Sequence, residues 1–537
     1  TVRLMVAADA RPSAEPIPGG VQSISDLIAE RAKVHPARDA LIDSRQRLSY
    51  AEVESLSRRW AYAYHALGLR AGNRVAASMG NSVELVMSHL AAMRAGLVWV
   101  GVNRALAAVE RDEILRDSGA SVLLVSGSEL EVAGGCRVVD AGGDAWRRLV
   151  AAAPSVDLPT IDPFAAAAIA YTSGTTGRPK GVVHSQRNML LPGVVARARG
   201  EGEGRIGMYL PLTSLNMQVL GPVYALVNGV RCVCIEQTDA ASVVAAVEAE
   251  GIERMSATAA TVYDLVVGEN IMPSELASLR ALTVGGSSTP DWLVDAYFDK
   301  FGARFLSGYG LTEAPGSVTR ERADRAHVLG SAGPALAQFE LAVIDDDGRV
   351  LPAGEVGEIC LRASTTGPFA RVYTPMLGYW NQPEASAAAL RAGWLHTGDI
   401  GRLGADGDLF VEDRRDDLIV RGGTNVYPAE IERVLLADVR VAHCAVVARS
   451  DLRLGQLPVA FVQLRPGASM STDDVMALCV ASLAKYEVPV DVRFVADFTR
   501  NTMGKIVRAE LRTLLRAEGL GAPRPVAKHS GRHGRLG

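Results

Sequence analysis

Cysteine, long hydrophobic runs and excess charge are all scarce in this chain of 537 residues. Its six cysteines are scattered and form no Cys-x-x-Cys pair, which indicates reduced core thiols rather than a disulfide framework. No apolar stretch reaches the roughly eighteen residues of a membrane span. Residues 1–20 also lack the hydrophobic core of a secretion signal. We therefore expect a cytoplasmic protein without a membrane span.

The charge balance gives no support for a nucleic-acid-binding protein. The formal net charge is −4 and the body of the chain has no long basic run, so nothing in the sequence favours nucleic-acid binding. Apolar residues make up 48% of the chain, which is enough to build large cores. The length predicts more than one domain.

Helical and extended patterns alternate through the first part of the chain. Ser49 and Glu52 have the spacing of a capping box, and apolar residues follow at helical intervals. Extended and helical patterns then take turns at residues 74–79, 82–94, 97–102, 107–117 and 121–126. This order predicts an α/β fold in which a parallel sheet carries helices on both faces.

Two later strands end in glycine-rich turns. The strand predicted at 279–284 runs into Gly285, Gly286 and Ser287, and the strand at 303–306 runs into residues 307–313. Because ligands collect at the carboxyl ends of strands in open α/β sheets, we expect these turns to reach one site. Beyond residue 340 the pattern changes to short antiparallel strands, and beyond residue 427 to a compact α+β unit.

The stretch 171–181 is built almost entirely of glycine and hydroxyl side chains and follows an apolar strand at 165–170. Its glycines let the backbone approach a ligand, its hydroxyls and amides can bond anionic oxygens, and Lys180 adds a positive charge. The pattern predicts a triphosphate site. It is not a Walker A loop, because Lys180 is followed by Gly181 rather than by Ser or Thr. The candidate phosphate-binding residues are Thr172, Ser173, Gly174, Thr175, Thr176, Gly177 and Lys180.

This loop is the first of five segments that resemble the adenylate-forming superfamily, which includes acyl- and aryl-CoA synthetases, peptide-synthetase adenylation domains and luciferases. The other four follow in the family's order and spacing, at Tyr309–Glu313, Trp394–Asp399, 413–432 and Asn501–Lys505. The resemblance covers about residues 20–515. It implies an AMP-forming enzyme that uses ATP and Mg²⁺.

The resemblance also implies a domain plan. A large N-terminal domain over residues 1–412 would hold stacked, mostly parallel sheets with helices and a small β subdomain. A small, mobile α+β domain would follow at 413–520. Residues 521–537 are basic and rich in glycine and proline, and this composition, not the resemblance, predicts a disordered tail.

In such an enzyme a carboxylate attacks the α-phosphorus of ATP, which gives an acyl-adenylate and pyrophosphate. By resemblance, Glu313 would bind Mg²⁺ and Thr312 the α-phosphate. Asp399 would accept from the ribose hydroxyls, with Arg414 beside them. The expected walls of the adenine site are Gly285, Gly286, Ser287, Gly308 and Gly310, with Tyr309 stacked on the base.

Lys505 matches the catalytic lysine of the superfamily, whose ammonium would contact both the substrate carboxylate and the α-phosphate. Asp416 matches the hinge, about which the small domain would swing after adenylation. The swing would remove Lys505 and bring Gly422 and Gly423 to the site, where glycine admits the thin pantetheine arm of coenzyme A.

The chain departs from the family pattern at Thr213 and Ser214, where relatives usually carry an aromatic residue and a histidine that gate the thiol tunnel. Leu215 is not the aspartate with which amino-acid-activating relatives hold an α-ammonium group, so free α-amino acids are disfavoured. We expect Thr213, Ser214 and Gln218 to shape the acid pocket. The acid would be aryl, or of short to medium length.

The preferred hypothesis is a carboxylic acid–CoA ligase with a small acid, ATP and coenzyme A as its partners. A second hypothesis keeps the adenylation step but transfers to a carrier protein or an amine, or uses an inorganic oxyanion. A third, a nucleotide-binding protein without catalysis, is disfavoured because Glu313, Asp399 and Lys505 are all present. A luciferase-like oxygenase would share every motif, and a homodimer is left open.

Overall fold

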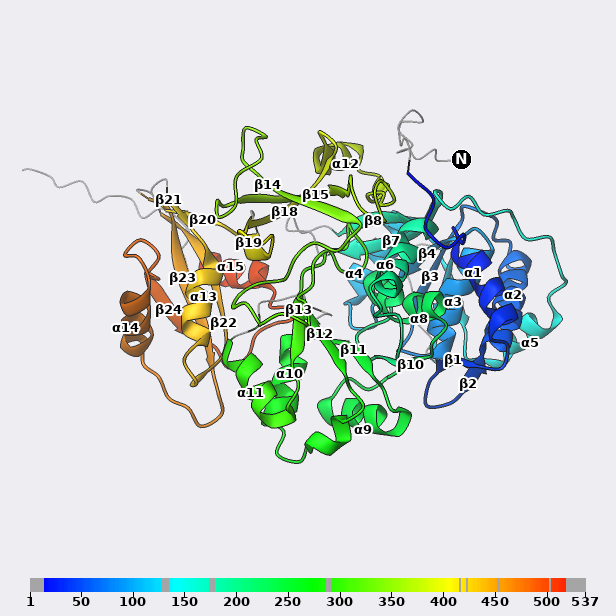
Figure 1. Ribbon diagram of the computed structural model, residues 1–537, viewed down its shortest axis with the longest axis horizontal. Coiled ribbons are helices and arrows are strands. Elements are labelled where there is room, and N and C mark those ends of the chain that lie inside the picture. The colour runs from blue at the N-terminus through cyan, green and yellow to red at the C-terminus, as the bar shows by residue number, and fades with distance from the viewer. Residues whose placement is uncertain are drawn as a thin grey trace, which may run out of the picture. The chain divides into compact units, whose positions relative to one another are not determined.

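The computed structural model describes residues 14–127, 135–172, 179–285, 289, 291–414, 417–421, 424–451, 454–501 and 504–517 (Figure 1). Within these ranges the chain divides into two compact units. The first takes residues 14–411 and 504–505, and the second takes residues 412–501 and 506–517. Each unit has its own apolar core.

The first unit contains a seven-stranded sheet, here sheet I, that carries the phosphate-loop segment. Its central strands β7, β4, β3, β5 and β6 are parallel, as the alternating pattern predicted, whereas β8 and β16 are antiparallel additions at one edge. In sheet order the strands are β16 (Gly378–Tyr379), β8 (Lys180–Ser185), β7 (Ala166–Thr172), β4 (Val98–Gly101), β3 (Arg74–Ser78), β5 (Val122–Val125) and β6 (Arg137–Asp140).

A second seven-stranded sheet, sheet II, carries the two glycine-rich turns. It is parallel except at its edge, where β2 returns antiparallel to β1. In sheet order the strands are β13 (Phe305–Gly308), β12 (Ala281–Gly285), β11 (Arg254–Ala257), β9 (Ile206–Met208), β10 (Cys232–Cys234), β1 (Asp39–Ile42) and β2 (Arg47–Ser49).

Helices join these strands and fill the space between the sheets. The predicted capping box begins α2, since the Ser49 and Glu52 side chains each bond the other's backbone amide. The helices of this unit are α1 (Ile24–Val34), α2 (Tyr50–Ala66), α3 (Val83–Arg94), α4 (Ala108–Ser118), α5 (Asp144–Ala152), α6 (Gln186–Ala198), α7 (Leu215–Gln218), α8 (Tyr224–Asn228), α9 (Ala240–Glu250), α10 (Ala259–Val267), α11 (Asp291–Phe301) and α12 (Pro383–Ala389). A π-helical turn (Val219–Val223) lies between α7 and α8, and a 3₁₀ turn (Pro273–Leu276) follows α10.

Sheets I and II share one core. Val75 and Ala77 of β3 pack in the same apolar cluster as Ile206 and Met208 of β9, with the buried face of α3 among them. The residue between them on β3, Ala76, faces a separate cluster with α4 on the other side of sheet I. This alternation gives sheet I two covered faces, as its apolar strands predicted.

A smaller antiparallel sheet, sheet III, follows in the chain and confirms the predicted change of pattern after residue 340. Its order is β14-β15-β18-β17, and β19 pairs with β18. The strands are β14 (Phe339–Ile344), β15 (Gly357–Ala363), β17 (Leu390–Arg391), β18 (Trp394–Leu403) and β19 (Leu409–Arg414). β19 reaches past residue 411, where the first unit ends.

The second unit is an α+β structure around its own sheet. Strand β23 lies between β20 and β22 and also pairs in parallel with β24. Arg508 and Glu432 form an ion pair at 2.8 Å that ties two of its helices together. The elements are β20 (Ile419–Arg421), β21 (Thr424–Val426), α13 (Pro428–Leu436), β22 (Val441–Asp451), β23 (Gly455–Leu464), α14 (Thr472–Ser482), β24 (Asp491–Phe494) and α15 (Arg508–Ala517). Among the described residues of the chain, no helix has both the length and the apolar character that a membrane crossing requires.

The burial of His89, on α3, in the core of the first unit can be tested. The side chain is fully buried beside Trp99, and neither ring nitrogen has a hydrogen-bond partner among the described residues. Burial lowers the pKa of His89 from 6.5 to about 3. Between pH 6.5 and about 3, His89 is therefore protonated in the unfolded chain but neutral in the folded chain. As the pH falls through this window, His89 lowers the free energy of unfolding by up to about 1.4 kcal/mol per pH unit.

We predict that His89→Leu raises the melting temperature at pH 7, because two unpaired polar atoms leave the core, and raises it further at pH 5. Thermal unfolding followed by circular dichroism at both pH values measures this. An equal shift at pH 7 and pH 5 would contradict the assigned protonation behaviour.

Candidate active site

The two ends of the predicted phosphate loop are held side by side by a β-hairpin. β7 and β8 pair antiparallel with Thr172 opposite Lys180, and the Thr172 hydroxyl donates to the Lys180 carbonyl oxygen at 3.5 Å. The sequence predicted the strand before the loop but not that the segment after it returns as its antiparallel neighbour. Five predicted members of the loop lie outside the described residues: Ser173, Gly174, Thr175, Thr176 and Gly177.

Tyr379 links the loop lysine to the predicted magnesium ligand. The Lys180 ammonium lies over the Tyr379 ring, 5.4 Å from its centroid, and the Tyr379 hydroxyl donates to Glu313 Oε1 at 2.8 Å. Tyr379 is placed there by β16, which pairs with β8 so that Tyr379 stands opposite Val182. The structure thus brings together Lys180 and Glu313, which the sequence predicted separately, through a residue that it did not predict.

The carbonyl oxygen of Thr312 is fixed by a buried histidine from sheet I. His184 Nε2 lies 2.7 Å from it, and because a carbonyl oxygen only accepts, Nε2 carries the hydrogen. Burial lowers the pKa of His184 to about 4, so the ring is neutral at physiological pH. The bond joins β8 of sheet I to the segment that follows β13 of sheet II. His184 was not predicted as a site residue.

Asn216 of α7 holds the same segment from another side. Its Nδ2 donates to the Leu311 carbonyl and its Oδ1 accepts from the Gly316 amide, both at 3.4 Å. The backbone around Thr312 and Glu313 is therefore bonded to sheet I and to α7. We expected the loops to meet at the carboxyl ends of an open sheet, and the structure shows that they come from two different sheets.

The glycines at the ends of β12 and β13 let backbone segments pack closely. Gly285 stands opposite Gly308 in the parallel pair. A Cβ added to Gly308 would lie 3.0 Å from the Thr319 carbonyl oxygen, and one on Gly310 would lie 2.6 Å from the Gly316 carbonyl oxygen. Close backbone approach is thus a structural reason for glycine at 308 and 310. Gly286 and Ser287 lie outside the described residues.

Asp399 is bonded to Tyr309. The Tyr309 hydroxyl donates to Asp399 Oδ2 at 2.5 Å, and both side chains are largely buried. Burial, and then the charge of Asp399, hold the pKa of Tyr309 well above its ordinary value, so the phenol keeps its proton. The predicted ribose and adenine residues are therefore in contact. Arg414 ends β19, and its side chain lies outside the description.

The predicted acid-pocket residues surround the start of α7. Thr213 is buried and Ser214 is the N-cap residue of the helix. Gln218 is fully buried, and its Nε2 donates to the Leu212 carbonyl oxygen at 2.8 Å, so it braces the loop before α7. A Cβ on Gly101 of β4 would lie 1.8 Å from the Thr213 carbonyl oxygen, so only glycine allows this loop to pass.

The remaining predicted residues belong to the later part of the chain. Lys505 is exposed and follows Gly504, whose φ is +78°. Asp416, Gly422 and Gly423 lie outside the described residues.

The structure contains a cavity of about 410 Å³ beside the loop end of the phosphate-loop hairpin. Tyr171 in its wall donates to Asp117 Oδ2 at 2.5 Å. The lining residues are Glu113, Ile114, Asp117, Tyr171, Pro179, Lys180, Asn381 and Gln382.

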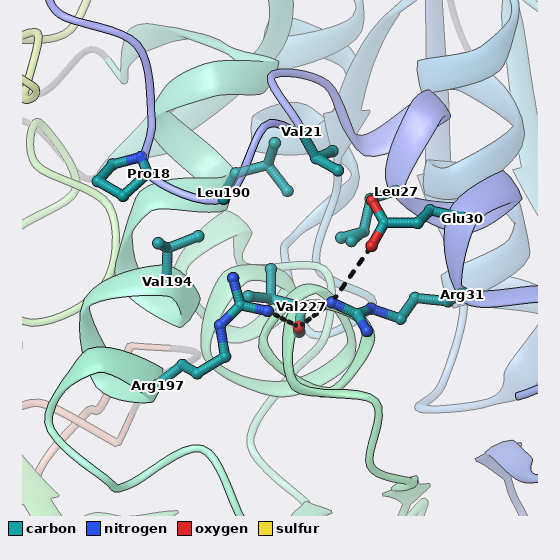
Figure 2. Close-up of a pocket in the computed structure, with 10 residues that line it drawn as sticks. Pro18, Val21, Leu27, Glu30, Arg31, Leu190, Val194, Arg197 and Val227 are labelled. Carbon is teal, nitrogen blue, oxygen red and sulfur yellow. Dashed lines mark hydrogen bonds and ion pairs between the residues drawn. The ribbon is translucent and has the colours of Figure 1, made fainter. Parts of the chain in front are cut away.

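A smaller cavity of about 40 Å³ has a different wall, built from α1, α6 and α8. Figure 2 shows that Arg31 and Arg197 both donate to the Val227 carbonyl oxygen there, at 3.0 and 3.2 Å. Because Val227 lies in the last turn of α8, these bonds satisfy a helix carbonyl, and we assign them a structural role.

Comparison with known proteins agrees with this arrangement. Residues 28–380 match the family model described as AMP-binding enzyme, and residues 430–505 match the AMP-binding enzyme C-terminal domain. The chain therefore belongs to the AMP-binding enzymes, the adenylate-forming superfamily that its motifs resemble.

Particular relatives cover nearly the whole chain. A feruloyl-CoA synthase from Amycolatopsis sp is 33% identical over 91% of this chain and 99% of its own length. A 2-succinylbenzoate–CoA ligase from Geobacillus kaustophilus is 34% identical over 92% and 98%. The solved structure of Bacillus subtilis o-succinylbenzoate coenzyme A synthetase with ATP and magnesium is 30% identical, with a TM-score of 0.81 over 90% of this chain and 98% of that one.

The contact between Tyr379 and Glu313 leads to a prediction. We expect Tyr379→Phe to lower the rate of acid-dependent ATP–pyrophosphate exchange about tenfold, because the Glu313 carboxylate loses its hydrogen-bond donor while the ring over Lys180 remains. The matched control is Tyr373→Phe, which removes a buried hydroxyl that has no hydrogen-bond partner among the described residues. An equal loss of exchange in both variants would contradict the role of the Tyr379 hydroxyl.

Proposed function

We propose that this protein is an ATP-dependent carboxylic acid–CoA ligase that works through an acyl-adenylate. The observation that carries the proposal is the cluster of Lys180, Tyr379 and Glu313 beside Thr312. In this cluster the Lys180 ammonium and the Glu313 carboxylate both contact Tyr379, next to the end of the predicted phosphate loop. Membership of the AMP-binding enzymes supports the same chemistry.

The first half-reaction joins the acid to AMP. A carboxylate oxygen of the substrate forms a bond to the α-phosphorus of ATP, the bond from that phosphorus to the bridging oxygen breaks, and pyrophosphate leaves. Lys180 neutralises charge on the phosphate chain and the Thr312 hydroxyl bonds the α-phosphate. This chemistry needs positioning and neutralisation of charge more than covalent participation by the protein.

The chain offers an oxygen ligand for Mg²⁺ at Glu313. Tyr379 occupies Oε1, and Oε2 accepts no hydrogen bond from any residue that the structure describes. A carboxylate oxygen is a ligand that this hard cation prefers. Bound there, Mg²⁺ would offset the negative charge of the phosphate chain.

Lys505 is the proposed catalytic lysine, which stabilises the charge that shifts from carboxylate to phosphate. In the second half-reaction the thiol of coenzyme A attacks the acyl carbon, the bond to the adenylate oxygen breaks, and AMP leaves with the thioester as product. We assign Asp416 as the hinge between the two steps, and Gly422 and Gly423 as the passage for the pantetheine arm.

The adenosine of ATP is assigned to the two glycine-rich turns and to sheet III. Tyr309 stacks on the base between Gly285, Gly286, Ser287, Gly308 and Gly310, and Asp399 accepts from the ribose hydroxyls, with Arg414 beside them. The direct bond between Tyr309 and Asp399 supports a shared site.

The proposed acid is aryl, or of short to medium length. An aryl acid is supported by two relatives, which are named as a feruloyl-CoA synthase and a 2-succinylbenzoate–CoA ligase. ATP and coenzyme A as substrates, together with six cysteines that all remain free thiols, support a location in the cytoplasm.

We predict that Lys505→Ala lowers acid-dependent ATP–pyrophosphate exchange on the order of 100-fold or more, but leaves thioester formation from a supplied acyl-adenylate within about threefold of the unaltered enzyme. The two half-reactions are measured separately, by isotope exchange and by thioester absorbance. Equal losses in both would refute the assignment of Lys505 to adenylation alone.

A substrate screen tests the proposed activity itself. Pyrophosphate release is measured over aryl, short, medium and long acids, and each active acid is then tested for a CoA thioester by mass spectrometry. We expect an aryl, short-chain or medium-chain acid to give pyrophosphate, AMP and the thioester. Release of AMP without a thioester would favour a carrier protein or an amine as the acceptor.

A further inference from the structure

Asp399 is displayed by a bulge in β18. Across the antiparallel pair of β15 and β18, Cys360 stands opposite His396 but Glu358 stands opposite Ile400. The residues 397–399 of β18 therefore face a single residue, Ile359, on β15. A bulge of this kind bends a strand and re-aims its side chains, and bulges occur preferentially beside active sites.

Two side chains hold the bulge in place. Glu358 Oε1 accepts from the Gly398 amide at 3.1 Å. The Thr397 hydroxyl donates to the Ile359 carbonyl oxygen at 2.7 Å and accepts from the Asp399 amide at 3.0 Å. Gly398 has φ +73°, a backbone conformation that residues with a side chain rarely adopt, so glycine suits this position of the bulge.

The Glu358 carboxylate is itself held firmly. Its Oε2 lies 2.9 Å from His396 Nδ1 and 3.2 Å from an Arg391 nitrogen. Cys360 Sγ lies 3.2 Å from the same imidazole nitrogen, so both contacts hold His396 at Nδ1. Glu358 is 7% exposed, and a buried carboxylate with several donors keeps one geometry.

We propose that Glu358 and Thr397 are positioning residues for the nucleotide, which act by holding the bulge that presents Asp399 to the ribose hydroxyls. The inference rests on the proposed function, because it needs Asp399 at the ribose. Glutamate is required at 358 because both carboxylate oxygens accept hydrogen bonds. In Glu358→Gln one of them becomes an NH₂ group, which would face either the Gly398 amide or the His396 ring.

The test compares ATP with 2′-deoxy-ATP and 3′-deoxy-ATP in acid-dependent pyrophosphate release. We expect the unaltered enzyme to prefer ATP by at least about tenfold in kcat/KM, because an analogue without the hydroxyl leaves the Asp399 carboxylate without a partner. Glu358→Gln should reduce this preference to about threefold or less, since a displaced Asp399 no longer distinguishes the sugars. A role in general stability would lower kcat/KM for all three nucleotides equally.

Three further variants make the result decisive. Thr397→Val tests the second support of the bulge independently, should Glu358→Gln fail to fold. Glu340→Gln is the matched control: Glu340 pairs with Arg362 at 2.5 Å across β14 and β15 and does not bond the bulge, so the preference for ATP should persist. Asp399→Ala should abolish the preference.

The outcomes separate the two levels of the proposal. If Asp399→Ala keeps the preference for ATP, the ribose assignment within the proposed function fails. If Asp399→Ala loses the preference while Glu358→Gln or Thr397→Val keeps it, the positioning role given to that residue is overturned.

Discussion

The hydrogen bond from the neutral His184 ring to the Thr312 carbonyl oxygen is the constraint on which the site depends. It ties the returning strand of the phosphate-loop hairpin in sheet I to the segment that leaves sheet II. Tyr379 of β16, which pairs with that returning strand, makes a second tie through its hydrogen bond to Glu313. A buried imidazole can serve in this way because burial keeps it uncharged, so it donates to a carbonyl without the cost of an unpaired buried charge. Two sheets that share a core are thus also joined at the candidate active site.

The same principle of backbone fixation recurs in sheet III. There the Thr397 hydroxyl and the Glu358 carboxylate bond the backbone of a bulge rather than a ligand, and Asp399 is the side chain that the bulge displays. Near Thr312 and near Asp399 alike, a buried polar side chain forms hydrogen bonds with main-chain atoms beside a predicted nucleotide contact. The residues expected to touch the nucleotide therefore stand on segments whose backbone is already ordered, which reduces the entropy lost on binding.

Much of the fold could be predicted because its signals are local. The strands at 74–79, 97–102 and 121–126 and the capping box at Ser49 follow from periodicity and spacing over a few residues, and the structure confirms them as parallel strands and as the start of α2. The return of β8 against β7 could not be predicted, because an apolar strand does not reveal its partner. β16 could not be predicted either, because two residues have no periodicity.

The site shows the same division. Lys180, Glu313 and Asp399 stand in recognisable motifs, so the sequence could identify them as candidates, and their roles stay predictions. Tyr379 and His184 could not, since each acts through a contact with a residue 66 or 128 positions away. Glu358 was missed because its hydrogen bond to Gly398 depends on a shift of register between two strands that no residue pattern encodes. Contacts between residues that are far apart in the sequence and outside any motif could therefore not be predicted.

The central claim is that a substrate carboxylate attacks the α-phosphorus of ATP in this site. The most direct measurement supplies an active acid with both carboxyl oxygens labelled by ¹⁸O, together with ATP and coenzyme A, and analyses the products by mass spectrometry. The account predicts that one ¹⁸O appears in the phosphoryl group of AMP and the other in the thioester carbonyl. AMP without ¹⁸O, formed along with the thioester, would contradict it.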